Sequence, residues 1–220
     1  MKENVLIFII AFAITCVIIY FQFFTKSAVI KNKIKKFKEK KIGEVKDGEF
    51  VSIKGKVVLA GRSLTAPLSL RKCAYYHISV KDSSSSRETF KNYIDIEEEK
   101  VSDIVVFDGE HYAVIDTKIL ATYAYHDNEQ RSGFWDSTTN ELKAFLKKHG
   151  ERTSDYIGWS LDLCATEGVL EEGEKVAIAG KASWRDAKLF KIKIPSKKVL
   201  YIESINEHGV YITDDIGGTI

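Results

Sequence analysis

The sequence predicts a mainly β protein with one N-terminal transmembrane helix, followed by a β-rich, barrel-like domain that carries one inserted α-helix. Three observations support this fold class. Residues 5–24 form an apolar run whose only polar members are Thr15, Tyr20 and Gln22. The rest of the chain alternates short apolar runs with turn residues, and two strings of fourteen residues are similar to each other. The repeat suggests two related β units, which begin near residues 44 and 169.

The apolar run, VLIFIIAFAITCVIIYFQFF, contains no charged residue, proline or glycine. Twenty residues at about 1.5 Å each span roughly 30 Å, the thickness of a bilayer's hydrocarbon core. We therefore predict that residues 1–25 form an anchor that contacts membrane lipid through residues 5–24. A cleaved signal peptide would have a shorter apolar region, and the small-x-small spelling at residues 11–13 comes too early for one. A helix buried in a soluble core is the other alternative.

Residues 26–42 are strongly basic, with eight lysines and one glutamate between residues 26 and 41. Apolar residues at helical spacing predict a basic juxtamembrane helix or linker. Because positive charge stays on the cytoplasmic side, we expect a single-pass protein with its N-terminus outside and its domain in the cytoplasm. The lysines are either a topology signal alone or candidate contacts with an anionic membrane surface, namely Lys31, Lys33, Lys35, Lys36, Lys38, Lys40 and Lys41.

The β domain is expected over residues 43–213, with a C-terminal tail at 214–220. Its first string, Glu44 to Val57, shares six of fourteen residues with Val169 to Ala182. In both copies a turn glycine precedes a strand, and a second glycine, Gly55 or Gly180, lets the strand bend. Convergence of any strand that follows a tight turn is the alternative to duplication.

The other expected elements follow from alternation and turn chemistry. A capping box of Thr138 and Glu141 begins the one helix, and Gly150 ends it. Residues 122–137 are expected to form a polar loop, whose Phe134 and Trp135 either contact a partner or fold back onto the core. Strands are predicted at residues 73–80, 89–96, 104–107, 112–115, 156–165, 189–194, 199–204 and 210–213.

Two sets of spaced residues resemble a known family. They are Gly55-Lys56-Val57 with Leu64, Ala66-Pro67-Leu68, Cys73-x-Tyr75-Tyr76 and Val80, and then Glu167-x-x-Leu170-x-x-Gly173-Glu174-x-Val176-x-Ile178-x-Gly180. Over about residues 43–205 this pattern is similar to the GIDE, or beside-a-membrane, domain. That family includes membrane-anchored RING-type ubiquitin or SUMO ligases and many prokaryotic membrane proteins. The resemblance implies a membrane-proximal module that binds partners or substrates.

A ubiquitin-transferase function would be inherited from the family name alone. A RING needs eight cysteine or histidine zinc ligands in paired spacing, and this chain has three scattered cysteines and five scattered histidines. A weaker likeness, in Gly180 to Trp184 and the strands that follow, is to the small soluble barrel of NfeD-like membrane proteins.

Enzyme motifs are absent from the sequence, which has no CxxC, GxSxG, P-loop, GxGxxG or HExxH. We expect no catalytic, cofactor-binding or metal-binding residues. Cys73 near His77 is the only arrangement that resembles a nucleophile with a base, since strand alternation would place both on one face with Tyr75. We favour a structural role for Cys73 and Cys164, and a disulfide between them stays open.

The function that we expect is a non-catalytic module that binds an unidentified protein partner or acts as a scaffold. The alternatives are an enzyme that uses Cys73, and an anionic-lipid or nucleic-acid binder. Residues 42–220 carry a net charge of −5, which makes nucleic acid an unlikely partner. A stacking groove for bases is conceivable in one basic, aromatic stretch, but a solvated strand face explains it more simply: Lys181, Trp184, Arg185, Lys188, Phe190, Lys191 and Lys193.

Overall fold

The computed structural model describes residues 25–82, 94–132, 138–154, 161–204 and 209–216. The predicted membrane span, residues 5–24, and the candidate contacts Phe134 and Trp135 lie outside the described residues. Within the described part, no helix has both the length and the apolar character that crossing a bilayer requires.

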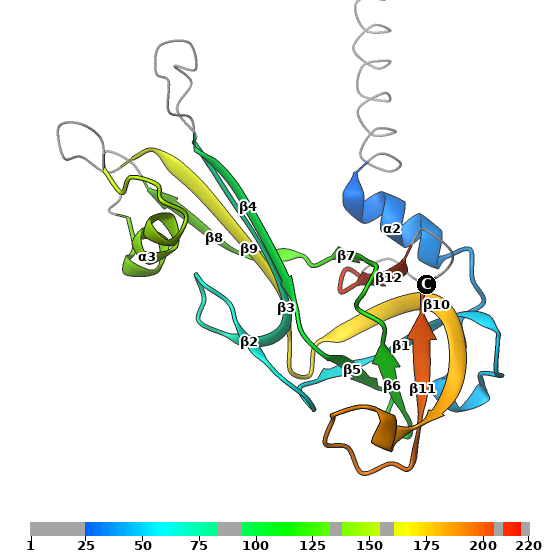
Figure 1. The fold of residues 1–220 in the computed structure, drawn as a ribbon. Coiled ribbons are helices and arrows are strands. Elements are labelled where there is room, and N and C mark those ends of the chain that lie inside the picture. The colour runs from blue at the N-terminus through cyan, green and yellow to red at the C-terminus, as the bar shows by residue number, and fades with distance from the viewer. Residues whose placement is uncertain (1–24, 83–93, 133–137, 155–160, 205–208, 217–220) are drawn as a thin grey trace, which may run out of the picture.

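The prediction of a mainly β fold with a barrel is confirmed. Five strands close on themselves in the order β1, β5, β6, β11 and β10, because β10 pairs with both β11 and β1 (Figure 1). Strand β12 pairs with β10 beside the barrel, and β7 pairs with β12. The bounds are β1 Phe50–Val58, β5 Ile104–Phe107, β6 Tyr112–Ile115, β7 Leu120–Tyr123, β10 Lys175–Asp186, β11 Lys198–Glu203 and β12 Val210–Thr213.

A second sheet of five strands extends away from the barrel as an arm (Figure 1). Its centre is the long antiparallel pair β3 and β9, with β8 on the free side of β9 and both β2 and β4 along β3. Helix α3 packs on one face of this sheet through Leu142, Phe145 and Leu146. The bounds are β2 Leu64–Thr65, β3 Lys72–Asp82, β4 Asp95–Val101, β8 His126–Ser132, α3 Asn140–Lys148 and β9 Leu163–Glu171.

The two copies of the repeated string pair with each other as neighbouring strands of the barrel. Strands β1 and β10 are antiparallel, and Ile53 lies opposite Ile178, the equivalent residue of the other copy. Each turn glycine donates its backbone N–H to the other copy at equivalent places, Gly48 to Ala182 O and Gly173 to Val57 O, both at 2.8 Å. The two copies are therefore related by an approximate two-fold axis between the two isoleucines.

Close approach of neighbouring strands requires the second glycine of each copy. A Cβ atom on Gly55 would lie 2.8 Å from the carbonyl oxygen of Phe107 in β5, and one on Gly180 would lie 2.8 Å from that of Glu203 in β11. Both glycines thus sit where a strand turns from its partner copy to the next barrel strand. The barrel closes because these two positions lack side chains.

Alternation along the paired strands fills the barrel with apolar side chains. Val51, Ile53 and Val57 of β1 point inward, as do Val176 and Ile178 of β10, and all five are fully buried. The intervening residues of β1 and β10 face outward. This outward face is covered in part by the first helix of the described chain.

That helix is α2, Lys26–Ile34, and it is shorter than the helix or linker expected over residues 26–42. Thr25 caps it by accepting a hydrogen bond from Ala28 N at 3.2 Å. After Ile34 the chain turns, and residue 39 forms a bridge with Ser52 of β1, so the backbone leaves helical geometry to pair with the barrel. The described residues also contain two short 3-10 helices, at Ile42–Glu44 and Ala187–Leu189.

Several predicted elements need correction. The cap of α3 is Thr139, not Thr138, and its hydroxyl accepts from Leu142 N at 3.2 Å. Residues 122–137 are not all loop, because they contain the end of β7 and all of β8. Strand β8 is polar in sequence, HDNEQRS, since it lies at a sheet edge where alternate side chains face solvent. Residues 189–194 form no strand. Leu189 ends the second 3-10 helix, and the partly buried side chains of Phe190, Ile192 and Ile194 pack near Val199.

Candidate functional site

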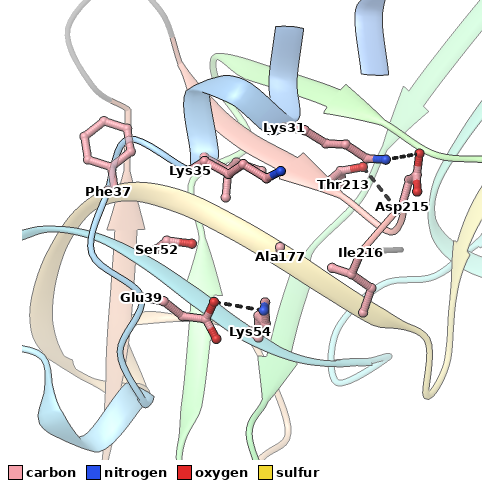
Figure 2. Close-up of a pocket in the computed structure, with 11 residues that line it drawn as sticks. Lys31, Lys35, Phe37, Glu39, Ser52, Lys54, Ala177, Thr213, Asp215 and Ile216 are labelled. Carbon is pink, nitrogen blue, oxygen red and sulfur yellow. Dashed lines mark hydrogen bonds and ion pairs between the residues drawn. The ribbon is translucent and has the colours of Figure 1, made fainter. Parts of the chain in front are cut away.

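A groove runs between α2 and the outward face of the barrel, and we call it the α2 groove (Figure 2). Its floor is the outward face of β1 and β10. The end of α2 with residues 35–39 forms one wall, and residues 213–216 form the other. The cavity beside α2 has a volume of about 200 Å³. An adjoining cavity of about 590 Å³, lined by β1, β10 and the turn after β5, shares Lys54 and Ile216 with it, and we include both in the α2 groove.

The sequence places lysines on this floor through simple strand alternation. Lys54 and Lys56 alternate with inward-facing residues of β1, and Lys175 begins β10. In the antiparallel register Lys54 lies opposite Ala177, and Lys56 lies directly opposite Lys175. Two like charges at opposed positions repel each other, so the pair Lys56–Lys175 costs stability in the empty groove.

Two of the lysines in the groove are neutralised by carboxylates of the same groove. Lys31 Nζ lies 2.5 Å from Asp215 Oδ2, and Lys54 Nζ lies 2.8 Å from Glu39 Oε2 (Figure 2). Asp215 also accepts a hydrogen bond from Ser27 Oγ at 3.1 Å, which ties α2 to the end of β12. The carboxylates of Asp215 and Glu39 are therefore already paired with lysines of the groove.

The third carboxylate of the groove, that of Asp108, is held by the backbone. Burial opposes its ionisation, but hydrogen bonds from the N–H groups of His111, Glu110 and Ile42 outweigh burial and hold its pKa below the usual value. Lys35, Lys56 and Lys175 form no ion pair with any residue that the structure describes. The groove thus offers three uncompensated cations beside an apolar surface of Ile34, Phe37 and Ile216.

The lysines predicted to contact a membrane surface are divided by the structure into separate groups. Lys31 pairs with Asp215, and Lys40 pairs with Glu49 at 2.5 Å. Among the seven, only Lys31 and Lys35 line the α2 groove. Within the described ranges, Lys33, Lys36, Lys38 and Lys41 form no ion pair. Membrane contact stays a prediction for all seven lysines. Sequence reasoning missed Lys54, Lys56 and Lys175, because their convergence depends on the pairing of β1 with β10.

A second feature lies at the loop between β2 and β3, residues 66–71, where the two family-like motifs meet. Glu167 of β9 is fully buried, and its carboxylate accepts hydrogen bonds from Leu68 N at 2.8 Å and Ser69 N at 2.9 Å. The next residue, Leu70, has φ of 58° and a side chain that is 59% exposed. It is the one residue other than glycine with positive φ in the described part of the chain.

The far end of this loop is fixed by Arg71. Its guanidinium donates two hydrogen bonds to Asp127 of β8, both at 2.6 Å, and lies 3.5 Å from Glu171. These bonds to Asp127 raise the pKa of Arg71 despite its partial burial. A left-handed leucine costs roughly 1–2 kcal/mol, and a buried carboxylate carries a desolvation penalty. The loop therefore combines a strained backbone position at Leu70 with an exposed apolar side chain.

Cys73 lacks the surroundings of a nucleophile. A β-bulge at Ala74 shifts the register of β3, so Cys73 shares a cluster with Tyr76 and not with Tyr75 as alternation suggested. Burial raises the pKa of the Cys73 thiol to about 11, and burial also lowers the pKa of His77. Cys164 of β9 lies opposite Lys81 of β3, at the other end of that strand from Cys73. Both cysteines are free thiols.

The basic and aromatic residues at the end of β10 contact other residues of the protein. Arg185 lies over the ring of Tyr201 at 3.9 Å from its centroid, and Phe190 stacks on the same tyrosine at 5.3 Å. The indole of Trp184 donates a hydrogen bond to Val45 O at 2.9 Å. Arg185 and Phe190 thus contact Tyr201, and Trp184 bonds to the backbone, so these side chains are already engaged within the protein.

Neither protein-family models nor curated proteins nor solved structures gave a match to this chain. Within the described residues, no group of three or more histidine, cysteine, aspartate or glutamate side chains is arranged to hold a metal ion. The features that any proposal must explain are therefore the α2 groove, the docked helix α2 and the Leu70 loop.

Proposed function

We propose that the chain is a single-pass membrane protein whose cytoplasmic, GIDE-like β domain binds a protein partner next to the membrane. Residues 5–24 would anchor it, and the domain would act as a scaffold without catalytic residues of its own. The observation that carries the proposal is the docking of α2 onto the barrel. Because α2 begins at Lys26, directly after the predicted anchor, its docking would fix which face of the domain lies near the membrane.

The docking is strong enough to hold this orientation. Ile30 and Ile34 are buried against Ala177 and Tyr211 of the barrel sheet. Burying two isoleucine side chains stabilises the contact by about 3–5 kcal/mol, and the half-buried pair Lys31–Asp215 adds up to about 1 kcal/mol. Residues 26–34 therefore behave as part of the domain and not as a free linker.

The surface that we propose for the protein partner is the Leu70 loop. A strained, exposed leucine held by a buried carboxylate has no role in the core, and such strain is typical of binding sites. It lies on the arm sheet, on a different element from the docked helix α2. Ubiquitin transfer is not part of the proposal, since the sequence lacks the paired cysteine and histidine ligands of a RING.

The membrane part of the proposal is tested by extraction. Full-length protein should stay in the membrane pellet after alkaline carbonate treatment, and its domain should be cleaved by protease added from the cytoplasmic side. Release by carbonate, or protection of the domain on that side, would refute the anchor or its orientation.

The binding part is tested by changing Leu70→Asn in the full chain. Asparagine tolerates positive φ, so the fold should be retained or stabilised by up to about 1 kcal/mol while the apolar contact is lost. The matched control is Leu189→Asn, because Leu189 is 72% exposed but lies at the barrel end. Partners recovered by crosslinking in the membrane should disappear with the first variant and persist with the second. Equal recovery with both variants would exclude the loop as the binding surface.

A further inference from the structure

We propose that the α2 groove binds an anionic lipid, with its phosphate or carboxylate between Lys56 and Lys175 and its apolar part against α2. This inference rests on the proposed membrane anchoring, and it assigns a ligand to a site distinct from the Leu70 loop. It starts from the directly opposed lysines of β1 and β10, whose repulsion an anion would turn into attraction.

The charge balance of the groove favours an anion over a cation or a neutral ligand. Each carboxylate that lines it already has partners: Asp215 has Lys31, Glu39 has Lys54, and Asp108 has three backbone N–H groups. The groups left for a ligand are the ammonium groups of Lys35, Lys56 and Lys175. A free carboxylate that could hold a cation is not found among the described residues of the groove.

The apolar surface of the groove favours an amphiphile over a simple anion. Ile34, Phe37 and Ile216 line the cavity next to α2, which also holds the two internal ion pairs and Lys35, while Lys56 and Lys175 line the adjoining one. These apolar side chains therefore lie near the helix that would leave the membrane. A lipid would enter with its acyl part toward α2 and its head group toward the paired lysines. The two cavities are in the size range of small-ligand sites.

The test uses the full chain in nanodiscs, with lysine reactivity measured by reductive methylation and mass spectrometry. One bilayer is phosphatidylcholine alone, a second adds dioleoyl phosphatidic acid, and a third is phosphatidylcholine with inorganic phosphate in the buffer. Bound lipid lowers the labelling rate by a factor equal to one plus the ratio of the lipid concentration to Kd. About a fivefold slower rate therefore marks a site that is mostly occupied. We expect this slowing at Lys56 and Lys175 with phosphatidic acid only, and no change at exposed Lys147 of α3.

Two variants separate ligand binding from a structural role. Lys175→Glu creates an ion pair with Lys56, so it should stabilise the empty protein and abolish the protection by phosphatidic acid. Lys147→Glu, which makes the same charge change on α3 and away from the groove, should leave the protection unchanged.

Other outcomes overturn the inference. Equal protection by inorganic phosphate would make the site one for free anions. Protection at Lys147 to the same degree would mean non-specific surface attraction without a site. No protection in any bilayer would refute the site. If the chain fails to enter nanodiscs, the anchoring proposal fails. Octyl phosphate added to the same chain in solution then tests the groove by itself. Protection of Lys56 and Lys175 supports the groove site, and absence of protection overturns it.

Discussion

Glu49 and Glu174 occupy equivalent positions in the two copies of the repeated string, and they are predicted to respond to pH with opposite sign. Each caps its own turn: Glu49 Oε2 accepts from Lys46 N at 3.2 Å, and Glu174 Oε2 accepts from Glu171 N at 2.9 Å. Their neighbours differ. Glu49 lies 2.5 Å from Lys40, whereas Glu174 faces the carboxylates of Asp214, Glu171 and Asp127.

The perturbation is Glu174→Gln. Burial, with the nearby carboxylates, raises the pKa of Glu174 from 4.5 to about 7. A raised pKa means that Glu174 contributes stability below about pH 4.5, and that this contribution is lost as the pH rises through about 7. At 1.36 kcal/mol per unit the full shift would cost about 3 kcal/mol, but Glu174 is partly exposed, so about 1 kcal/mol is expected after solvent screening.

Glutamine keeps the shape of the side chain and carries no charge at any pH. The variant should therefore match the parent in acid and exceed its free energy of unfolding by about 1 kcal/mol near pH 8. The assay is urea unfolding of the full chain in non-ionic detergent, followed by tryptophan fluorescence, across that pH range.

The matched control is Glu49→Gln. The hydrogen bond from Lys40 lowers the pKa of Glu49, so its contribution is present above the unfolded-state pKa and is lost as the pH falls through the folded-state pKa. This variant should be less stable than the parent at neutral pH, and the difference should fade in acid. If both variants lose stability near pH 8, or if the gain from Glu174→Gln grows toward acid, the reasoning from local environment is wrong.

Three further predictions concern the fold. Gly180→Ala should destabilise the protein by about 1–3 kcal/mol in the same unfolding assay, because its Cβ would meet the backbone of β11, and Gly55→Ala should do the same against β5. Glu167→Ala should cost about 3 kcal/mol by leaving Leu68 N and Ser69 N without acceptors, whereas exposed Glu97→Ala should change little. Iodoacetamide should modify half-buried Cys164 before buried Cys73 in the folded protein; faster modification of Cys73 would contradict its raised pKa.

Local sequence patterns were enough to predict the β class and several of its elements. The strands at residues 104–107 and 112–115 were predicted from alternation, and they form the antiparallel hairpin of β5 and β6. Polar strand β8 was missed, because an edge strand with solvent on one side has no apolar period to detect. The segment at residues 189–194 was mistaken for a strand, since Phe190, Ile192 and Ile194 alternate with lysines and are partly buried without strand pairing.

What the sequence determined by itself is the set of local features: turn glycines, alternating strands, a repeated string and a run of lysines after an apolar segment. What the tertiary structure decided is which of these meet. Pairing of the two copies around Ile53 and Ile178 set Lys56 against Lys175, and the fold brought Glu167 under Leu68 across almost a hundred residues. Such contacts depend on strand register and closure of the barrel, which are long-range properties that no short pattern encodes.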